Sequence, residues 1–148
     1  MSEVVKVRKL LKMYLGLDAQ ISNLNEQIER TRSQMHKITS HISNTPNGKG
    51  KTDWAASIDM LQELEKQLRS KIEEKCRMRS VITGLLDQVE NLQYRAILES
   101  RYFVGKSWQK IAMEKHYSLD SLWHIDSKEL RKMKLTPEAR QILGEPTD

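Results

Sequence analysis

The chain is poor in the residues that stabilise small secreted or strand-rich proteins. Its 148 residues include one cysteine, three prolines and six glycines, and aromatic residues make up 5%. The single cysteine, Cys76, excludes an intrachain disulfide and disfavours a cysteine-based zinc site. The apolar residues are mostly leucine, isoleucine and methionine at helical spacing, without the alternation of strands. These absences predict an all-α protein of a reducing compartment, the cytoplasm.

Long hydrophobic runs are absent from the first segment of the chain. The stretch MSEVVKVRKLLKMYLG interrupts its apolar residues with lysine or arginine every few positions. A membrane-spanning helix needs about 20 mostly apolar residues, and a signal peptide needs an uninterrupted apolar centre. We therefore expect neither export nor a membrane partner.

The sequence also lacks the patterns that are typical of catalytic and metal sites. His36 and His41 are five residues apart and do not share a helical face, and His116 has no ligand partner nearby. There is no nucleophile paired with a base, and GKGK at 48–51 lacks the spacing of a phosphate-binding loop. We expect no enzyme, no metal and no cofactor.

The charge is moderately positive, +5 overall, and residues 101–134 carry eight lysines and arginines against four acidic residues. A basic segment favours an anionic partner, although a modest lysine excess is also ordinary in soluble proteins. Cations at a helix C-terminus also compensate the helix dipole. Lys128, Arg131 and Lys132 therefore have an explanation other than contact with phosphates.

A heptad seam dominates the first part of the chain. From residue 7 the apolar residues recur at gaps of three and four for about five repeats, with Thr31 as the single polar member. The seam predicts one long helix of roughly 50 to 60 Å, with association through its apolar face. The association residues are Leu17, Ile21, Leu24, Ile28, Met35 and Ile38.

A breaker rich in asparagine and glycine, 43–51, separates this helix from a second one. Thr52 and Asp53 supply an N-cap signature, and the apolar pattern that follows includes Ile72 and Cys76 and continues to Val89. Lys75 and Arg79 occupy positions where a strict heptad has apolar residues, so the buried face drifts or leaves its partner there. We predict a long antiparallel helical hairpin over 1–90 that associates within one chain or between two.

Residues 91–134 predict a helix-turn-helix domain. Ser107 caps a helix that directs Trp108, Ile111 and Ala112 inward, and Ser118 caps the next one after a turn at 116–117. The preceding helix is expected to close this core with Leu98, Tyr102 and Phe103. Residues 135–148 predict a short helix from Pro137 and a polar tail.

Two stretches within this domain carry a family resemblance. IDSKELRKM, 125–133, resembles the DNA-reading helix-turn-helix of bacterial sigma factor region 4. Together with RYFVGKSWQKIA, 101–112, it is similar to small phage transcriptional regulators of the ArpU and RinA type. The resemblance covers about residues 92–133, and the long hairpin adds only a similar general character. It implies double-stranded DNA as the partner and the cytoplasm of a bacterial host cell as the compartment.

The resemblance also implies roles for particular residues of the second helix and its surroundings. The residues implied to face the bases are Leu119, Asp120, Ser121, Trp123 and His124. Those implied to contact phosphates are Lys106, Lys110, Ser118, Lys128, Arg131 and Lys132. The sigma factor pattern usually has arginine among the base-facing positions, and this chain has none there.

Two functions agree with these patterns. The first is a homodimeric phage regulator of late genes, in which two weakly reading helix-turn-helix units gain affinity through a fixed spacing. The second is a non-enzymatic interaction protein whose helix-turn-helix docks on RNA polymerase or on a repressor. The base-facing positions carry acidic and apolar residues where a DNA-reading helix usually has arginine. This composition favours the second function.

Overall fold

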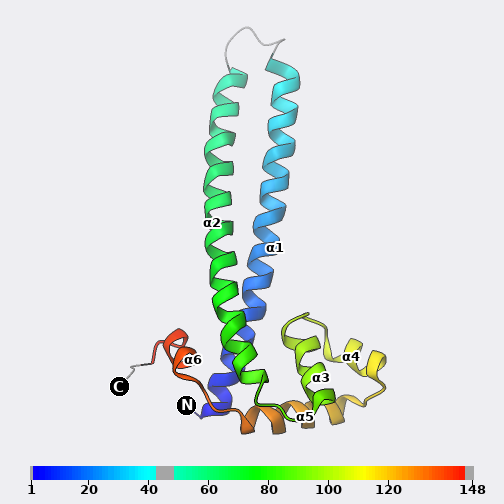
Figure 1. Cartoon of the computed structure of the whole chain (residues 1–148). Coiled ribbons are helices and arrows are strands. Elements are labelled where there is room, and N and C mark those ends of the chain that lie inside the picture. Colours follow the sequence, from blue (N-terminus) through cyan, green and yellow to red (C-terminus); the bar gives the residue numbers. More distant parts are fainter. Residues whose placement is uncertain (1, 43–48, 146–148) are drawn as a thin grey trace. The chain divides into compact units, whose positions relative to one another are not determined.

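The computed structural model describes residues 2–42 and 49–145, without the side chains of 41, 42, 49 and 50. Within these ranges all regular structure is helical, so the predicted all-α fold is confirmed. The helices, labelled in Figure 1, are α1 (Glu3–Ile42), α2 (Lys49–Leu86), α3 (Leu92–Tyr102), α4 (Trp108–Lys115), α5 (Leu119–Lys132) and α6 (Pro137–Ile142).

The chain forms two compact units. The hairpin unit is Asp18–Glu74, and the base unit combines Met1–Leu17 with Lys75–Asp148. Each unit therefore contains a piece of α1 and a piece of α2. This division differs from the sequence-based boundary at residue 90, because the first four turns of α1 have their buried contacts with the C-terminal part of the chain.

In the hairpin unit, α1 and α2 pack against each other as an antiparallel pair, as the heptad seam predicts. Leu24 and Ile28 of α1 form a buried cluster with Leu64 of α2. Thr31 is buried too, and its hydroxyl donates to the carbonyl oxygen of Gln27 at 2.9 Å, which satisfies the one polar member of the seam. Of the other association residues, Leu17 is buried in the base unit, and Ile21, Met35 and Ile38 are half-buried. The seam is thus occupied within a single chain.

From about residue 72 onward, across the boundary between the two units, the buried face of α2 has moved from the predicted one. Ile72 and Cys76 are exposed, whereas Met78 is buried among Leu10, Tyr14 and other α1 residues. This is the drift expected when a straight helix of 3.6 residues per turn follows a 3.5-residue repeat. Lys75 and Arg79 remain near the seam because they use aromatic partners: the Lys75 ammonium lies 5.7 Å from the Tyr14 ring centroid, and the Arg79 guanidinium lies 4.3 Å from that of Phe103.

The helix boundaries differ from the predicted ones at the breaker. Helix α2 begins at Lys49, so 49–51 are helical and the predicted cap at Thr52 and Asp53 lies inside the helix. One glycine costs a helix interior only about 1 kcal/mol, which does not stop a long helix from extending over it. The remainder of the predicted loop, 43–48, lies outside the described residues.

Helix α3 is separate from α2 and does not continue it. Helix α2 ends at Leu86, and the side chain of Asn91 accepts hydrogen bonds from the backbone N–H groups of Gln93 and Tyr94 at 2.9 and 3.2 Å. An asparagine in this position satisfies two of the donors that every helix start leaves unpaired. The cap at Asn91 therefore fixes where α3 begins.

Candidate nucleic-acid interface

Helices α4 and α5 form the predicted helix-turn-helix, and both predicted caps are present. The Ser107 hydroxyl accepts from the backbone N–H of Lys110, and the Ser118 hydroxyl accepts from that of Ser121, each at 3.1 Å. Serine at this position stabilises a helix by about 1 kcal/mol relative to alanine. Since the two helices are only 8 and 14 residues long, these caps contribute to setting where each begins.

The turn between them depends on a left-handed residue. His116 has φ 60° and ψ 42°, and it is the one residue other than glycine with a positive φ in the described part of the chain. Its backbone N–H donates to the carbonyl oxygen of Ala112, as does that of Tyr117 at 3.1 Å. Turns of this motif often carry glycine, and histidine is one of the residue types enriched in this conformation. The position of the turn was predicted, but its conformation was not.

The core of the helix-turn-helix differs from the predicted one in the contribution of α3. Ile97 packs with Ile111, Leu122 and Ile125, and half-buried Tyr94, Trp108, Ala112 and Tyr117 surround them. Of the three residues predicted to close this core, Leu98 and Phe103 pack into the cluster that α1 and α2 form in the base unit instead. Tyr102 belongs to that cluster as well, but it also contacts the helix-turn-helix: its ring lies edge-on to that of Trp108 at 6.4 Å, and its hydroxyl donates to Asp126. The reason is that α3 is apolar on two sides and lies between two clusters. A prediction that gives the helix one buried face does not show which residue belongs to which cluster.

The residues implied to face DNA bases lie on the surface of α5. Asp120, Ser121 and His124 are exposed, Trp123 is 50% exposed, and Leu119 is half-buried. The Ser121 hydroxyl accepts a hydrogen bond from Ser118 at 2.8 Å, which leaves its own proton available for an acceptor. The helix therefore presents an acidic, a hydroxyl, an imidazole and an indole group on its open side.

The residues implied to contact phosphates fall into two groups. Lys110, Lys128 and Arg131 are exposed, and none of them has an ion-pair partner among the described residues. The others have partners: Lys106 forms an ion pair with Glu114 at 2.7 Å, Lys132 lies 3.6 Å from Glu129, and Ser118 caps α5. The hydrogen bond from Lys106 holds the pKa of the Glu114 carboxyl below its ordinary value. The three unpaired cations are consequently those best able to meet an anion.

A buried polar network behind α5 was not identified from the sequence. Asp126 is 4% exposed; it accepts from the Tyr102 hydroxyl and from Nη1 of Arg8, each at 2.7 Å. Burial, with the nearby carboxylate, raises the pKa of Tyr102, so its hydroxyl remains a donor. The signal for this network was weak: in α5, Asp126 falls on the same side as Leu122 and Leu130, where an apolar residue is expected.

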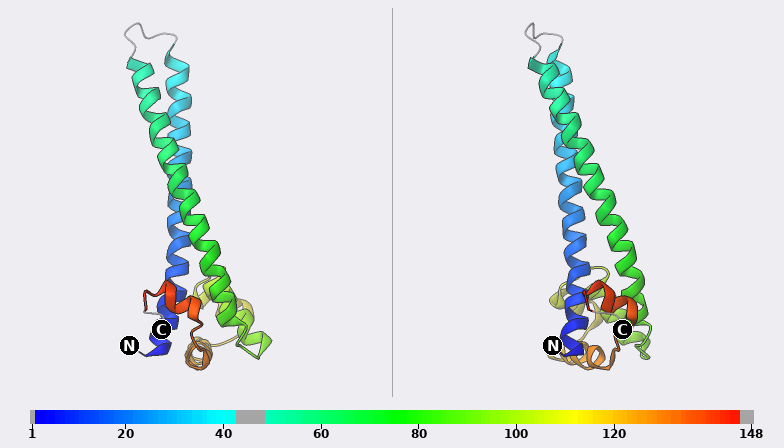
Figure 2. Two further views of the ribbon diagram at one scale, coloured as in Figure 1. Left: turned by 60° about the vertical axis from the view of Figure 1, so that its left-hand side comes forward. Right: turned by 90° about the vertical axis from the view of Figure 1, so that its left-hand side faces the viewer.

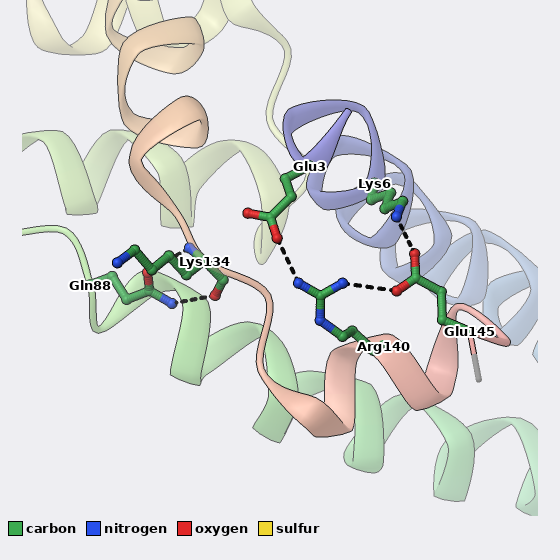
Figure 3. Close-up of polar contacts among 6 residues, drawn as sticks. All are labelled: Glu3, Lys6, Gln88, Lys134, Arg140 and Glu145. Atoms are coloured by element: carbon green, nitrogen blue, oxygen red, sulfur yellow. Dashed lines mark hydrogen bonds and ion pairs between the residues drawn. The ribbon is translucent and has the colours of Figure 1, made fainter. Parts of the chain in front are cut away.

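Polar contacts join the segment after α5 to the first turn of α1 and to the segment after α2 (Figure 3). The Gln88 side chain donates to the carbonyl oxygen of Lys134 at 2.9 Å and accepts from its N–H at 2.8 Å. Arg140 of α6 donates to Glu3 at 2.6 Å and to Glu145 at 3.0 Å, and Lys6 pairs with Glu145. Both views of Figure 2 show α6 beside the first turns of α1. These contacts attach the segment after α5 to Gln88, and α6 with the residues that follow it to the first turn of α1.

No protein-family model and no solved structure matches the chain. Within 2–42 and 49–145 there is no cluster of three or more histidine, cysteine or acidic residues able to hold a metal. None of the described helices has the length and apolar character needed to cross a membrane.

Proposed function

We propose that this protein binds double-stranded DNA through α5 and regulates transcription, in the manner of the phage regulators that its C-terminal sequence resembles. The observation that carries the proposal is the open face of α5. It combines four side chains able to contact bases with the unpaired cations Lys128 and Arg131, while the opposite face is fixed by buried contacts. A helix supported in this way can enter the major groove without losing its own packing.

The chemistry of the face supports modest sequence discrimination. A carboxylate such as Asp120 accepts from the cytosine amino group, His124 and Ser121 exchange hydrogen bonds with several base edges, and Trp123 packs against a thymine methyl group. Without arginine, the bidentate contact with guanine is missing, which is worth about 1–3 kcal/mol. We therefore propose that two copies bind together, as a homodimer, at adjacent half-sites in the control region of late phage genes.

The test is binding to a pool of random 30-base-pair duplexes, followed by recovery of the bound sequences. We expect salt-sensitive binding, because each phosphate contact releases a counterion and adds about 0.9 to the slope of log affinity against log salt. The variant Lys128→Glu with Arg131→Glu should weaken binding at least tenfold. The control, Lys66→Glu with Arg69→Glu, makes the same charge change at exposed positions of the hairpin unit and should bind as the wild type does.

A second function is favoured by one specific observation, the half-exposed Trp123. Tryptophan is enriched at the centres of protein interfaces, and here it is adjacent to half-buried Leu119 one turn earlier. The alternative proposal is that α5 docks on RNA polymerase or on a repressor. Trp123→Ala separates the two: it removes a protein complex that survives nuclease and high salt, whereas a DNA-binding protein retains its salt slope and changes its base preference.

A further inference from the structure

The charge of the chain is divided unequally between its two units. The base unit carries 17 lysines and arginines against 11 aspartates and glutamates, a net charge of +6, whereas the hairpin unit carries 8 against 9, a net charge of −1. Two base units therefore repel each other, and two hairpin units do not. Since the apolar seam of the hairpin is occupied within one chain, a second copy must meet it on one of its sides.

The two sides of the hairpin differ in charge. One side is marked by Arg32 of α1, whose guanidinium lies 3.3 Å from the Glu65 carboxylate of α2. The other side is formed by positions seven residues apart, which share one face of a helix. They lie roughly 50–95° around each helix from its buried seam, in the direction opposite to Arg32 and Glu65. These positions are Gln20, Gln27 and Gln34 on α1, and Met60 and Gln67 on α2. We name these five residues the glutamine side.

The glutamine side has the composition of a protein interface. None of its five residues carries a charge, and all are exposed, Met60 at 57%. Asp53 lies at one end of it, and the ion pair of Lys71 with Glu74 lies at the other. Charged residues are depleted at interface centres, because a buried charge loses its hydration. A glutamine amide both donates and accepts, so it can pair with the same amide of an identical copy across a two-fold axis.

One side of the hairpin is large enough for a stable dimer. At about 1.5 Å per residue, the part of α1 in the hairpin unit, 18–42, is roughly 37 Å long. Two helices packed about 8–10 Å apart make a side roughly 18–20 Å wide. The area is therefore on the order of 700 Å², close to the ~800 Å² that each partner contributes to a standard interface.

From these observations we infer that two copies of the chain associate through the glutamine sides of their hairpins, as a four-helix bundle. The inference rests on the proposed function, in which two copies bind together, and it names the surface that joins them. The glutamine amides pair with those of the second copy, and Met60 leaves the solvent. The Arg32 side stays in water, because burying its ion pair would cost more than pairing neutral amides.

The experiment measures the mass of the protein by sedimentation, without DNA, at concentrations from about 1 to 100 μM. Each chain is 17.3 kDa, and we expect twice that mass for the wild type. Gln27→Glu with Gln34→Glu places like charges across the contact and should weaken association at least tenfold, as should Met60→Glu. The new glutamates lie three residues before Arg30 and Lys37, so the helical circular dichroism signal should be retained.

Asn25→Glu with Thr39→Glu is the matched control. Both positions are exposed and lie seven residues from Arg32, so they add the same charge to the opposite side and should leave the dimer intact. A dimer lost equally in both double variants, or lost only in the control, overturns the inference and leaves the proposed function standing. A wild-type protein that is monomeric at about 100 μM overturns the inference and the homodimer together. A dimer that behaves as inferred but ignores DNA duplexes supports the inference and overturns the proposed function.

Discussion

Arg8 of α1 and Asp126 of α5 are 118 residues apart in sequence, and their side chains meet at 2.7 Å, with Asp126 almost completely buried. The hydrogen bond joins the start of the hairpin to the back of the helix proposed to read DNA. The carboxylate also accepts from Tyr102 of α3, so three helices share one buried acceptor. The orientation of α5 thus depends on residues far from the helix-turn-helix sequence itself.

Removing the charge of Asp126 is expected to destabilise the protein. Asp126→Asn leaves two donors facing a poorer acceptor, and breaking a fully buried pair costs about 3–5 kcal/mol. Because the Arg8 side chain is 34% exposed and regains water, we expect a loss of about 2–3 kcal/mol in the free energy of unfolding. Urea denaturation measures it. Asp120→Asn, an exposed aspartate of the same helix, should cost no more than about 1 kcal/mol; equal effects of the two variants would contradict the prediction.

The contacts of Glu145 predict an acid-sensitive contribution to stability. The hydrogen bonds from Lys6, and then from Arg140, lower the pKa of Glu145 in the folded protein. A carboxyl with a lowered folded-state pKa stabilises the fold above its unfolded-state pKa of about 4.3, and this contribution disappears as the pH falls through the folded-state value. The melting temperature of Glu145→Gln should therefore lie below that of the wild type at neutral pH and converge with it on acidification from about pH 5 to pH 3.

The matched variant for this measurement is Glu90→Gln, which changes an exposed glutamate. Its melting temperature should follow that of the wild type over the same range. A difference between Glu145→Gln and the wild type that persists to the lowest pH would show that the carboxylate charge is not the cause.

Replacement by glycine is expected to stabilise the protein at His116, where φ is positive, and to destabilise it at His124. His116→Gly removes the steric cost of a positive φ and should raise the free energy of unfolding by up to about 1 kcal/mol. His124→Gly places glycine inside α5 and should lower it by about 0.5 kcal/mol. Thermal denaturation of both variants is the measurement. A stabilising His124→Gly or a destabilising His116→Gly would mean that the turn is not strained as described.

Two apolar residues of α3, Ile97 and Leu92, are expected to differ in how much they contribute to the free energy of unfolding. Ile97 is fully buried between α4 and α5, whereas Leu92 is 79% exposed in the first turn of the same helix. Ile97→Ala should cost about 2–5 kcal/mol through lost burial and the cavity it leaves, and Leu92→Ala should stay within about 0.5 kcal/mol. Urea denaturation distinguishes them. A large effect of Leu92→Ala would indicate that this exposed leucine is covered in solution, for example by a second copy.

Much of the fold follows from local patterns that the sequence displays directly. The heptad seam over 7–38 predicts which side of α1 is buried, because packing between two helices imposes its period on the residues that make it. Ser107, Ser118 and Pro137 predict helix starts to the residue: each serine hydroxyl accepts from a backbone N–H three positions later, and the proline ring fixes its own φ at a helical value. The prediction fails at Ile72 and Cys76, where the period drifts and only the partner decides which face is covered.

For the candidate interface, too, the sequence predicts the exposed positions of α5 but not the partners of its buried positions. The exposure of Asp120, Ser121 and His124 follows from the period of α5 and from its buried side at Leu122 and Ile125. Local sequence does not identify Arg8 as the partner of Asp126.

By itself, the sequence determined that the chain is helical, where α4, α5 and α6 begin and which side of α1 forms the hairpin seam, because these depend on interactions across a few residues. The tertiary structure alone decided that Asp126 is buried with Arg8 and Tyr102, and that Leu98 and Tyr102 pack on the hairpin base while Ile97 closes the helix-turn-helix. Contacts between residues far apart in sequence require the folded chain, since no local period records which of two apolar faces meets which partner.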